Sequence, residues 1–380
     1  MSETAGMSTW SVRPAPPLPQ SATAPTVWAY VGMAECDRLS QVATWGWSDL
    51  HAPAQVLVPL LQPSRYVDRH IWLAVLGEGG DAQDVVGHVS LREPLTSNQH
   101  TAYLSLVVRP DHRGRGIGSS LVEVALRQAA ADGRTTLQAH SGHSPEPPVG
   151  PGALESPVGS GRVPLDDAAV RFALRHGFAL EQVARYSVLE LGEEHGAGTP
   201  EHATLLAEAR AHASDDYRTL TWLDEIPADR LDDVAALYTR MSTDAPMGGL
   251  DVEEDPWDGD RVTAMLNRAS GAGLHVLMTV AEHVATGRLV AFSVLEVPHA
   301  DVPFGFQEDT LVVREHRGRR LGMLVKAVNL EQLAARRPGI RRLHTWNAQE
   351  NAHMLGINVA LGFRQAGVSA AWQRVASVDA

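Results

Sequence analysis

Two short loops in this 380-residue sequence combine glycine with arginine, a combination suited to binding anions. The first loop follows an apolar run that ends in Val107 and Val108, and it consists of Arg113, Gly114, Arg115, Gly116, Ile117 and Gly118. A loop of this kind between a strand and a helix gathers backbone N–H groups and the positive helix end around one point. Guanidinium groups add charge-assisted hydrogen-bond donors. The loop is therefore a candidate site for a pyrophosphate group.

The second loop repeats the first near the other end of the chain. It follows Leu311, and its residues are Val312, Val313, Arg317, Gly318, Arg319, Arg320, Leu321 and Gly322. The copy keeps the two valines, the His-Arg-Gly-Arg and the last glycine, with a turn that is one residue shorter. Solenoid repeats recur every 20 to 50 residues, roughly, so a repeat this distant indicates duplication of a whole domain.

Two familiar phosphate-binding motifs do not fit these loops. A dinucleotide-binding fingerprint needs its third glycine at position 119, which is Ser119. The strand before each loop is also about the third or fourth of its repeat, whereas a Rossmann fingerprint follows the first. A Walker A loop ends in Gly-Lys-Ser or Gly-Lys-Thr, and the sequence contains neither.

The elements around the loops follow the same order in both repeats. Apolar alternation predicts strands, and amphipathic runs bounded by glycine or proline predict helices. In the first repeat, strands are expected at 71–76, 85–91, 102–108 and 135–140, with helices at 34–44, 116–131 and 166–175, before strands through 191. In the second, strands are expected at 217–223, 274–280, 289–297, 306–313, 341–346 and 363–375, with helices at 231–241, 257–269, 319–336 and 351–360. The sequence predicts an α/β protein with tandem domains at 26–191 and 217–380.

Three segments lie outside this repeated pattern. Residues 1–25 are rich in proline, and we expect a disordered tail there. Residues 141–164 contain six prolines among glycines, which indicates a mobile loop. Residues 192–216 are expected to be a linker that contains a helix at 201–213.

Composition excludes several classes of protein. The sequence is 44% hydrophobic and 20% charged, which is typical of globular domains. Its formal net charge of −13 argues against a nucleic-acid binder. No apolar run approaches the roughly 18 residues of a membrane span. We therefore expect a cytoplasmic location and no interaction with a membrane. Cys36 is the only cysteine, which excludes a Cys-based metal cluster, and we expect it to be a packing residue and no metal to be bound.

The first loop resembles the acetyl-CoA-binding motif of the GCN5-related N-acetyltransferases, the GNAT superfamily. The likeness rests on Arg113-x-x-Gly116-x-Gly118 after Val107-Val108, with Gly177-Phe178 closing a later helix. The second repeat resembles the motif through Arg317-x-x-Arg320-x-Gly322, and then through Asn347, Asn351 and Leu361-Gly362-Phe363. The resemblance extends from about residue 26 to 376, arranged as in tandem GNAT proteins.

The resemblance implies a mixed sheet in each domain, splayed between its fourth and fifth strands around the pantetheine of acetyl-CoA. Backbone N–H groups of Val107 and Val108, or of Val312 and Val313, would hold the thioester carbonyl. The pyrophosphate would lie on the loop that follows. Arg320 stands where the family usually has its middle glycine, and a side chain there either crowds the diphosphate or binds it.

The resemblance also implies a base on the fourth strand, because an alkylammonium must lose its proton before it attacks a thioester. Counting back from Leu311 with a period of two, Gln307 and Asp309 share its face, and Glu308 faces the other way. Asp309 is the first choice for the base and Glu308 the second. The same count in the first repeat places Leu104 opposite Asp309 and Ala102 opposite Gln307, so the first domain is expected to be non-catalytic or degenerate.

Three asparagines are further candidates in the second repeat. Family members often carry a tyrosine four residues before the helix-ending Gly-Phe, where it protonates the leaving thiolate; Asn358 and Ala173 occupy that position here. Asn358 can donate a hydrogen bond but is no acid, so His353 or water could supply the proton instead. Asn347 and Asn351 resemble the asparagines that bond pantetheine amides, or they cap the following helix.

Acidic residues surround Trp257 before a predicted helix of the second repeat; they are Asp251, Glu253, Glu254, Asp255, Asp258 and Asp260. Such a segment is more typical of a solvated helix N-terminus than of a binding site. In this family, however, the region lines the acceptor pocket, where an acidic rim would recruit a cationic amine.

The expected function is transfer of an acetyl group from acetyl-CoA to a primary amine, with catalysis in the second domain. The alternative is a non-catalytic protein that senses acyl-CoA or acts as a scaffold. Transfer of longer acyl groups is a third possibility. Small amines, aminoglycosides, peptide N-termini and protein lysines are all candidate acceptors. The chain could be a monomer whose two domains form a pseudo-dimer, or a homodimer.

Overall fold

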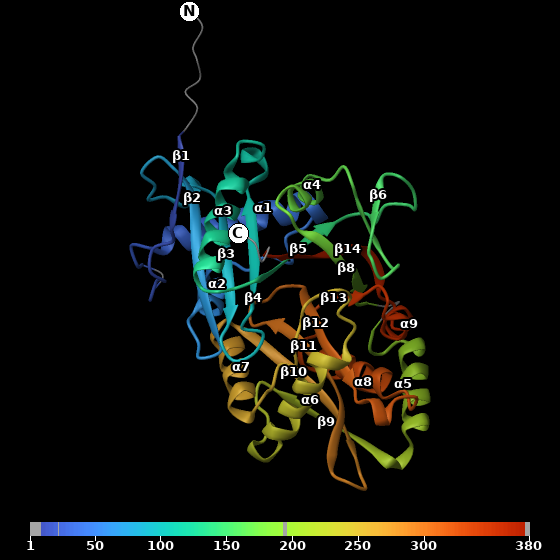
Figure 1. The fold of residues 1–380 in the computed structure, drawn as a ribbon. Helices are drawn as coiled ribbons and strands as arrows, with labels where there is room; N and C mark the ends of the chain where they lie inside the picture. Colours follow the sequence, from blue (N-terminus) through green and yellow to red (C-terminus); the bar gives the residue numbers. More distant parts are fainter. Residues whose placement is uncertain (1–8, 22, 193–195, 377–380) are drawn as a thin grey trace, which may run out of the picture. The chain divides into compact units, whose positions relative to one another are not determined.

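The computed structural model describes residues 9–21, 23–192 and 196–376. It divides into two compact units (Figure 1). Unit 1 comprises Met1–His140, Gly177–Ala179 and Trp372–Ala380, and unit 2 comprises Ser141–His176 and Leu180–Ala371. The bounds of the units differ from those of the expected domains 26–191 and 217–380. Residues 141–176 and 180–191 precede the linker but belong to unit 2. The boundary between the two sequence repeats stays a prediction.

Unit 1 is built on strands in the order β1-β2-β3-β4-β5. Their bounds are Trp10–Pro14, Val67–Leu76, Val85–Pro94, Thr101–Val108 and Thr136–His143. Neighbours are antiparallel except β4 and β5, which are parallel. Helix α1 (Val27–Trp45) buries Tyr30, Met33 and Cys36 in a core with β2 and β3, where α2 (Ala54–Leu61) also packs. Helix α3 (Ile117–Ala131) follows the first glycine loop.

The proline-rich start of the chain is not disordered throughout. Residues 10–14 form β1, which pairs with β2 from Trp10–Leu76 to Pro14–Trp72. An edge strand tolerates proline, because its outer side needs no N–H donor. Residues 1–8 lie outside the described residues.

The insertion at 141–164 is likewise more ordered than expected. Strand β5 continues to His143, and β6 (Ala153–Glu155) pairs with β7 (Arg162–Pro164) as a small hairpin. Leu154 lies opposite Val163, whose side chain is fully buried. Strand pairing and the burial of Val163 order this segment, and its content of proline and glycine does not reveal either.

Unit 2 contains strands in the order β8-β13-β12-β11-β10-β9. Their bounds are Ala179–Glu190, Arg342–Ala348, Phe304–Val312, Arg288–Pro298, Leu274–His283 and Tyr217–Leu223. Only the β12–β13 pair in this series is parallel. Strand β8 precedes the linker, yet it pairs with β13 from Ala184–Ala348 to Glu190–Arg342. Strand β14 (Arg364–Val375) ends the described chain.

Two helical layers cover the two faces of the unit 2 sheet. One core joins α5 (Pro200–Ala213), α8 (Leu321–Arg336) and α9 (Ala352–Ala360) to β11 and β13. The other core joins α6 (Leu231–Asp244) and α7 (Gly259–Gly271) to β10 and β11. Helix α4 (Ala168–Arg175) also belongs to unit 2. Among the described residues, every helix is too short or too polar to cross a membrane.

Candidate active site

The sheet of unit 2 opens between β12 and β13. The two strands pair only from Phe304–Arg342 to Phe306–His344, and the Thr345 hydroxyl then donates to the Gln307 carbonyl at 2.9 Å. Beyond that bond, β12 continues to Val312 without pairing with β13. The β4–β5 pair of unit 1 ends similarly, at Leu104–Ala139. Each unit therefore has a split at the strand that leads into its glycine loop.

The backbone of β12 directs one N–H group toward this split. The Val313 N–H donates to the Val290 carbonyl at 2.9 Å, so it is committed to β11. Successive N–H groups of a strand point to opposite sides, which directs the Val312 N–H away from β11. In unit 1 the Arg109 N–H donates to the Val86 carbonyl at 2.9 Å, so Val108 is the corresponding residue there. Of the expected oxyanion donors, Val312 and Val108 fit, whereas the N–H groups of Val313 and Val107 point toward the neighbouring strand.

The glycine loops have nearly identical geometry. Arg113 Nε donates to the Val108 carbonyl and Arg317 Nε to the Val312 carbonyl, both at 3.1 Å. Gly114 and Gly318 take positive φ angles of 75° and 82°, as glycine does at little cost. In both loops the arginine therefore binds the strand residue five positions earlier, and the turn of the second copy is not shorter, contrary to the sequence alignment.

Helices α3 and α8 begin with N–H groups that no side chain of the preceding residue caps. Their N-caps are Gly116 at φ 84° and Arg320 at φ 54°. Uncapped N–H groups at a helix start are the usual ligands of a phosphate. At Gly322, an added Cβ would lie 3.1 Å from Ile357 Cδ1, so this glycine permits α8 to approach α9 closely. Ile117, Gly118 and Leu321 occupy the first turns of the same two helices.

The arginines of the second loop are held by other side chains. Arg317 Nη2 lies 3.0 Å from Asp244 Oδ2, and the Arg319 guanidinium lies 5.8 Å from the Tyr217 ring centroid. Arg320 forms an ion pair with Glu208 of α5. In the first loop, Arg115 donates to the Asp111 carbonyl at 3.1 Å. Arg320 therefore does not project freely over the loop, and its left-handed backbone costs about 1–2 kcal/mol relative to glycine.

Strand β12 contains a β-bulge at the carboxylate pair. Ser293 pairs with Thr310 and Leu295 with Gln307, so the two residues Glu308 and Asp309 lie opposite Val294 alone. An inserted residue of this kind bends the strand and interrupts the alternation of its side chains. Relative to β4 of unit 1, strand β12 therefore contains one extra residue, and this residue lies in the strand and not in the glycine loop.

The bulge corrects two expectations from the period-two count. Gln307 donates to Ser293 Oγ at 3.1 Å and to the Val294 carbonyl at 2.8 Å, on the α8 side, whereas Leu311 packs in the α6–α7 core. Gln307 and Leu311 thus lie on opposite faces. In the unbulged ladder of unit 1, Leu104 corresponds to Gln307, and Ser105 takes the place of Glu308 and Asp309.

Three carboxylates and a tyrosine share the α6–α7 face near the bulge. Burial raises the pKa of Glu308 to about 8, with further contributions from the carboxylates of Glu296 and Asp309. Part of the Glu308 side chain also stays in contact with solvent. Burial also raises the pKa values of Asp309 and Glu296. The pKa of Tyr238 lies well above its ordinary value because of burial and these same carboxylates.

Sequence reasoning missed Glu296 and Tyr238. Glu296 is the only acidic residue in the apolar run of β11, a signal that a search for charges within predicted strands would have found. Tyr238 stacks on Trp257 with centroids 4.6 Å apart, and Trp257 also lies 4.3 Å from the Arg261 guanidinium. The effect of Asp309, Glu296 and Glu308 on the pKa of Tyr238 shows that this aromatic pair lies beside the carboxylates.

The acidic segment before α7 has mainly structural contacts. Asp258 Oδ1 accepts the Arg261 N–H at 2.7 Å as the N-cap of α7. Asp255 Oδ1 lies 2.7 Å from Arg261 Nη1. These contacts favour the structural interpretation of Asp255 and Asp258.

The asparagines of the second repeat lie on β13 and α9. Asn358 is buried and donates through Nδ2 to Asn347 Oδ1 at 2.5 Å, while its own Oδ1 is buried without a partner. Asn351 Oδ1 accepts the Met354 N–H at 3.2 Å and caps α9. The structure thus joins Asn347 to Asn358 and gives Asn351 the capping contact. His353 is exposed on the same helix.

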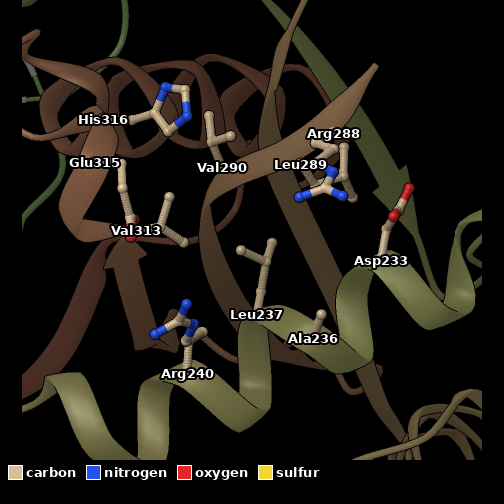
Figure 2. Close-up of a pocket in the computed structure, with 10 residues that line it drawn as sticks. All are labelled: Asp233, Ala236, Leu237, Arg240, Arg288, Leu289, Val290, Val313, Glu315 and His316. Carbon is tan, nitrogen blue, oxygen red and sulfur yellow. The ribbon is translucent and has the colours of Figure 1, made fainter. Parts of the chain in front are cut away.

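A hollow of about 620 Å³ lies beside the second loop. Figure 2 shows it between α6, the start of β11 and the residues after β12. Arg240 and Leu237 face Val313 and Glu315 across it. The carboxylates of the bulge do not line it, so the hollow adjoins the loop and not the acidic cluster.

Comparison with known proteins agrees with this geometry. Residues 37–145 match the acetyltransferase (GNAT) family. A tandem GNAT protein from the clavulanic acid biosynthesis pathway superposes with a TM-score of 0.69 at 21% identity, covering 98% of this chain and 100% of its own. Residues 37–145 therefore carry the GNAT family match, which lies within the first repeat. The whole chain is similar in fold to a tandem GNAT protein.

A GCN5-related N-acetyltransferase from Sphaerobacter thermophilus has a TM-score of 0.60 to this chain at 14% identity, with 96% of this chain and 95% of its own covered. No curated protein matches the sequence. These likenesses establish the fold, and the chemistry depends on the residues described above.

Proposed function

We propose that this protein transfers an acetyl group from acetyl-CoA to a cationic amine, and that unit 2 is the catalytic unit. The observation that carries the proposal is the bulge of β12, which places Glu308 and Asp309 beside the split between β12 and β13. Acetyl-CoA supplies the activated acetyl group. The split, the uncapped start of α8 and the buried Oδ1 of Asn358 are the features suited to its pantetheine and pyrophosphate.

Glu308 is the proposed base. An alkylammonium has a pKa of about 10 and is unreactive until it loses its proton. A carboxylate with a pKa of about 8 accepts that proton far more readily than an ordinary glutamate. The order expected from sequence, with Asp309 first, is therefore reversed, and Asp309 is proposed to help hold the cation.

The remaining steps use backbone and solvent. The neutral amine attacks the thioester carbonyl, whose developing negative charge the Val312 N–H stabilises. The new N–C bond forms as the C–S bond breaks, and the nitrogen then releases its excess proton to water. The thiolate takes a proton from water in turn, because Asn358 is no acid and the raised pKa of Tyr238 makes it a poor one.

The carboxylates also support the class of acceptor. Glu296, Glu308 and Asp309 bring three carboxyl groups with raised pKa values together beside the Tyr238–Trp257 pair, and nearby cations would favour their ionised forms. We infer an acceptor with a second cationic group or a cationic neighbour next to the reacting amine. Unit 1 has Arg92 at the ladder position of Glu296, 4.0 Å from the Tyr103 ring centroid. A cation there disfavours binding of an ammonium.

The test is release of CoA thiol by the full chain with a panel of monoamines and diamines. The proposal predicts amine-dependent release, fastest with diamines, and a loss of about 10²–10⁴ in kcat/KM for Glu308→Gln. Ser105→Ala, the matched change in unit 1, should leave turnover unchanged. Tight acetyl-CoA binding without release by any amine would instead favour the sensor. A loss of turnover only in the unit 1 variant would refute catalysis by unit 2.

A further inference from the structure

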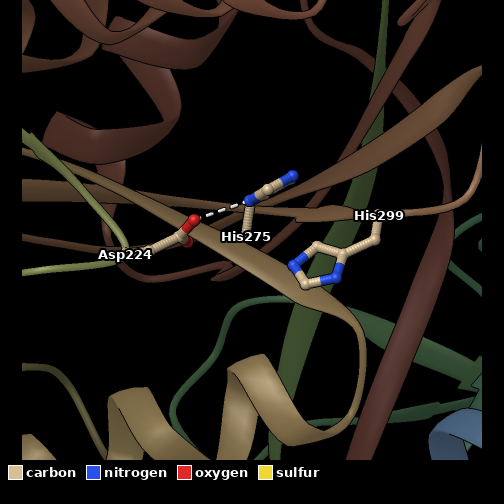
Figure 3. A group of neighbouring side chains, drawn as sticks. All are labelled: Asp224, His275 and His299. Carbon is tan, nitrogen blue, oxygen red and sulfur yellow. Dashed lines mark hydrogen bonds and ion pairs between the residues drawn. The ribbon is translucent and has the colours of Figure 1, made fainter.

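Three metal-ligating side chains meet at one end of the unit 2 sheet. Asp224 follows β9, His275 is the second residue of β10, and His299 follows β11 (Figure 3). One potential ligand atom from each residue lies within 4.8 Å of the others. The residues are far apart in sequence, so no local motif announces the cluster.

The antiparallel register brings these residues together. Leu223 pairs with Leu277, and Leu274 pairs with Pro298, so the end of β9, the start of β10 and the end of β11 coincide. His275 lies diagonally across from His299 on the same side of the sheet, because side chains alternate with a period of two.

The backbone around two of the side chains is fixed. Asp224 has a φ of 63°, its N–H donates to the Val276 carbonyl, and its Oδ1 accepts the Val276 N–H, both at 2.8 Å. The His299 N–H donates to the Gly273 carbonyl at 2.7 Å. An aspartate in the left-handed region whose N–H and carboxylate both bond to the backbone of Val276 is positioned before any ligand binds.

The cluster contains more Lewis bases than the protein satisfies. Asp224 Oδ2 lies 2.7 Å from His275 Nδ1, and the two imidazole rings are 4.1 Å apart between centroids. Within residues 9–21, 23–192 and 196–376, neither lysine nor arginine pairs with Asp224, and the His299 ring makes no hydrogen bond. Two close imidazole rings beside a carboxylate that no lysine or arginine neutralises are a set of ligands suited to a divalent cation.

We propose that Asp224, His275 and His299 form a binding site for a divalent transition-metal ion of the Zn²⁺ type. Imidazole and carboxylate ligands suit Zn²⁺, at distances of about 2.0–2.2 Å. The ion would take the place of the proton shared by Asp224 and His275, and solvent would complete its coordination. Binding requires the ligand atoms to close in from their present separations, which rotation of the exposed Asp224 and His299 side chains permits.

A second cluster shows why this one is selected. His70, Glu93 and Asp132 in unit 1 also bring ligand atoms within 4.8 Å of one another. There, Arg134 Nε lies 3.3 Å from Glu93 Oε2, so a protein cation already neutralises the carboxylate. A metal ion would have to displace a guanidinium in unit 1, whereas at His275 it displaces only a proton.

The site is separate from acetyl transfer, and its effect would be structural. It would link the ends of three neighbouring strands, of which β11 carries Glu296. Its existence does not depend on the proposed function.

The test is titration of Zn²⁺ into the untagged full chain by calorimetry, with Co²⁺ absorption as a probe of ligand geometry. We expect one site per chain, a rise of Tm with Zn²⁺, and at least a tenfold loss of affinity in His299→Ala and in His275→Ala. His212→Ala removes an exposed histidine of α5 and should bind as the wild type does.

Equal affinity and stoichiometry in the wild type and in both cluster variants would overturn the proposal. So would the absence of Zn²⁺ binding to the wild type. Asp224→Asn, which keeps the size of the side chain, distinguishes loss of a ligand from loss of structure, because circular dichroism should be unchanged while affinity falls.

Discussion

Arg320 forms an ion pair with Glu208, and this contact ties the first turn of α8 to α5. The guanidinium of the α8 N-cap residue is thus already paired with a carboxylate. We predict that Glu208→Gln releases Arg320 and lowers the KM for acetyl-CoA about two- to fivefold, since an exposed ion pair contributes up to about 1 kcal/mol. Glu331→Gln is the control, because Glu331 pairs with Arg210 across the same helices. An unchanged KM in Glu208→Gln would mean that Arg320 does not bind the diphosphate.

The pH profile should report Glu308. Its raised pKa predicts that kcat/KM increases as the carboxyl loses its proton, with a midpoint near pH 8. Glu308→Gln should remove this limb and leave the one near pH 10 that belongs to the amine. A limb at pH 8 that persists in Glu308→Gln but disappears in Asp309→Asn would reassign the base.

Glu296 should act on acceptor binding and not on proton transfer. We predict that Glu296→Gln raises the KM for a diamine about tenfold with little change in kcat, because it removes one charge that faces the second ammonium. Steady-state kinetics with a diamine and a monoamine of equal length measure the difference. Glu201→Gln, at the exposed start of α5, controls for net charge. Equal effects on both amines would contradict recognition of a second cation.

Lys326 offers a test of the core. It is the only lysine of the sequence and is almost fully buried, with Nζ 5.8 Å from the Phe363 ring centroid. Burial lowers its pKa to about 7. The unfolded chain therefore binds a proton that the folded protein lacks between pH 7 and the usual pKa of lysine, and stability rises with pH across that range.

Lys326→Met should consequently raise the free energy of unfolding by about 1–4 kcal/mol below pH 7, with the gain fading toward pH 10. Denaturant titrations at several pH values measure it. Lys326→Arg should destabilise at every pH, because a guanidinium stays charged. If the gain for Lys326→Met did not change with pH, the stabilisation would not come from the ionisation of Lys326.

Most elements were predictable because their signals are local. The strands and helices around both glycine loops follow from apolar period and from glycine at their ends, and the loops themselves from residue type. Strand β1 and the β6–β7 hairpin were missed, since their order depends on partners that composition does not reveal.

The site was less predictable for one geometric reason. A bulge at Glu308–Asp309 shifts the alternation of β12, so a count that starts at Leu311 fails at Gln307. The position of Glu296 beside Glu308 depends on the ladder between β11 and β12, and the partner of Arg320 depends on a side chain that is distant in sequence.

Strand β8 lies before the linker, yet it pairs with β13 along seven residue pairs. Cleavage of the chain at the apparent repeat boundary would remove β8 from unit 2. The N–H and C=O groups of β13 that pair with β8 would then be unpaired, and such an exposed strand edge promotes aggregation. A fragment that begins at the linker should therefore not behave as an independent protein, although it would contain the whole of the second sequence repeat.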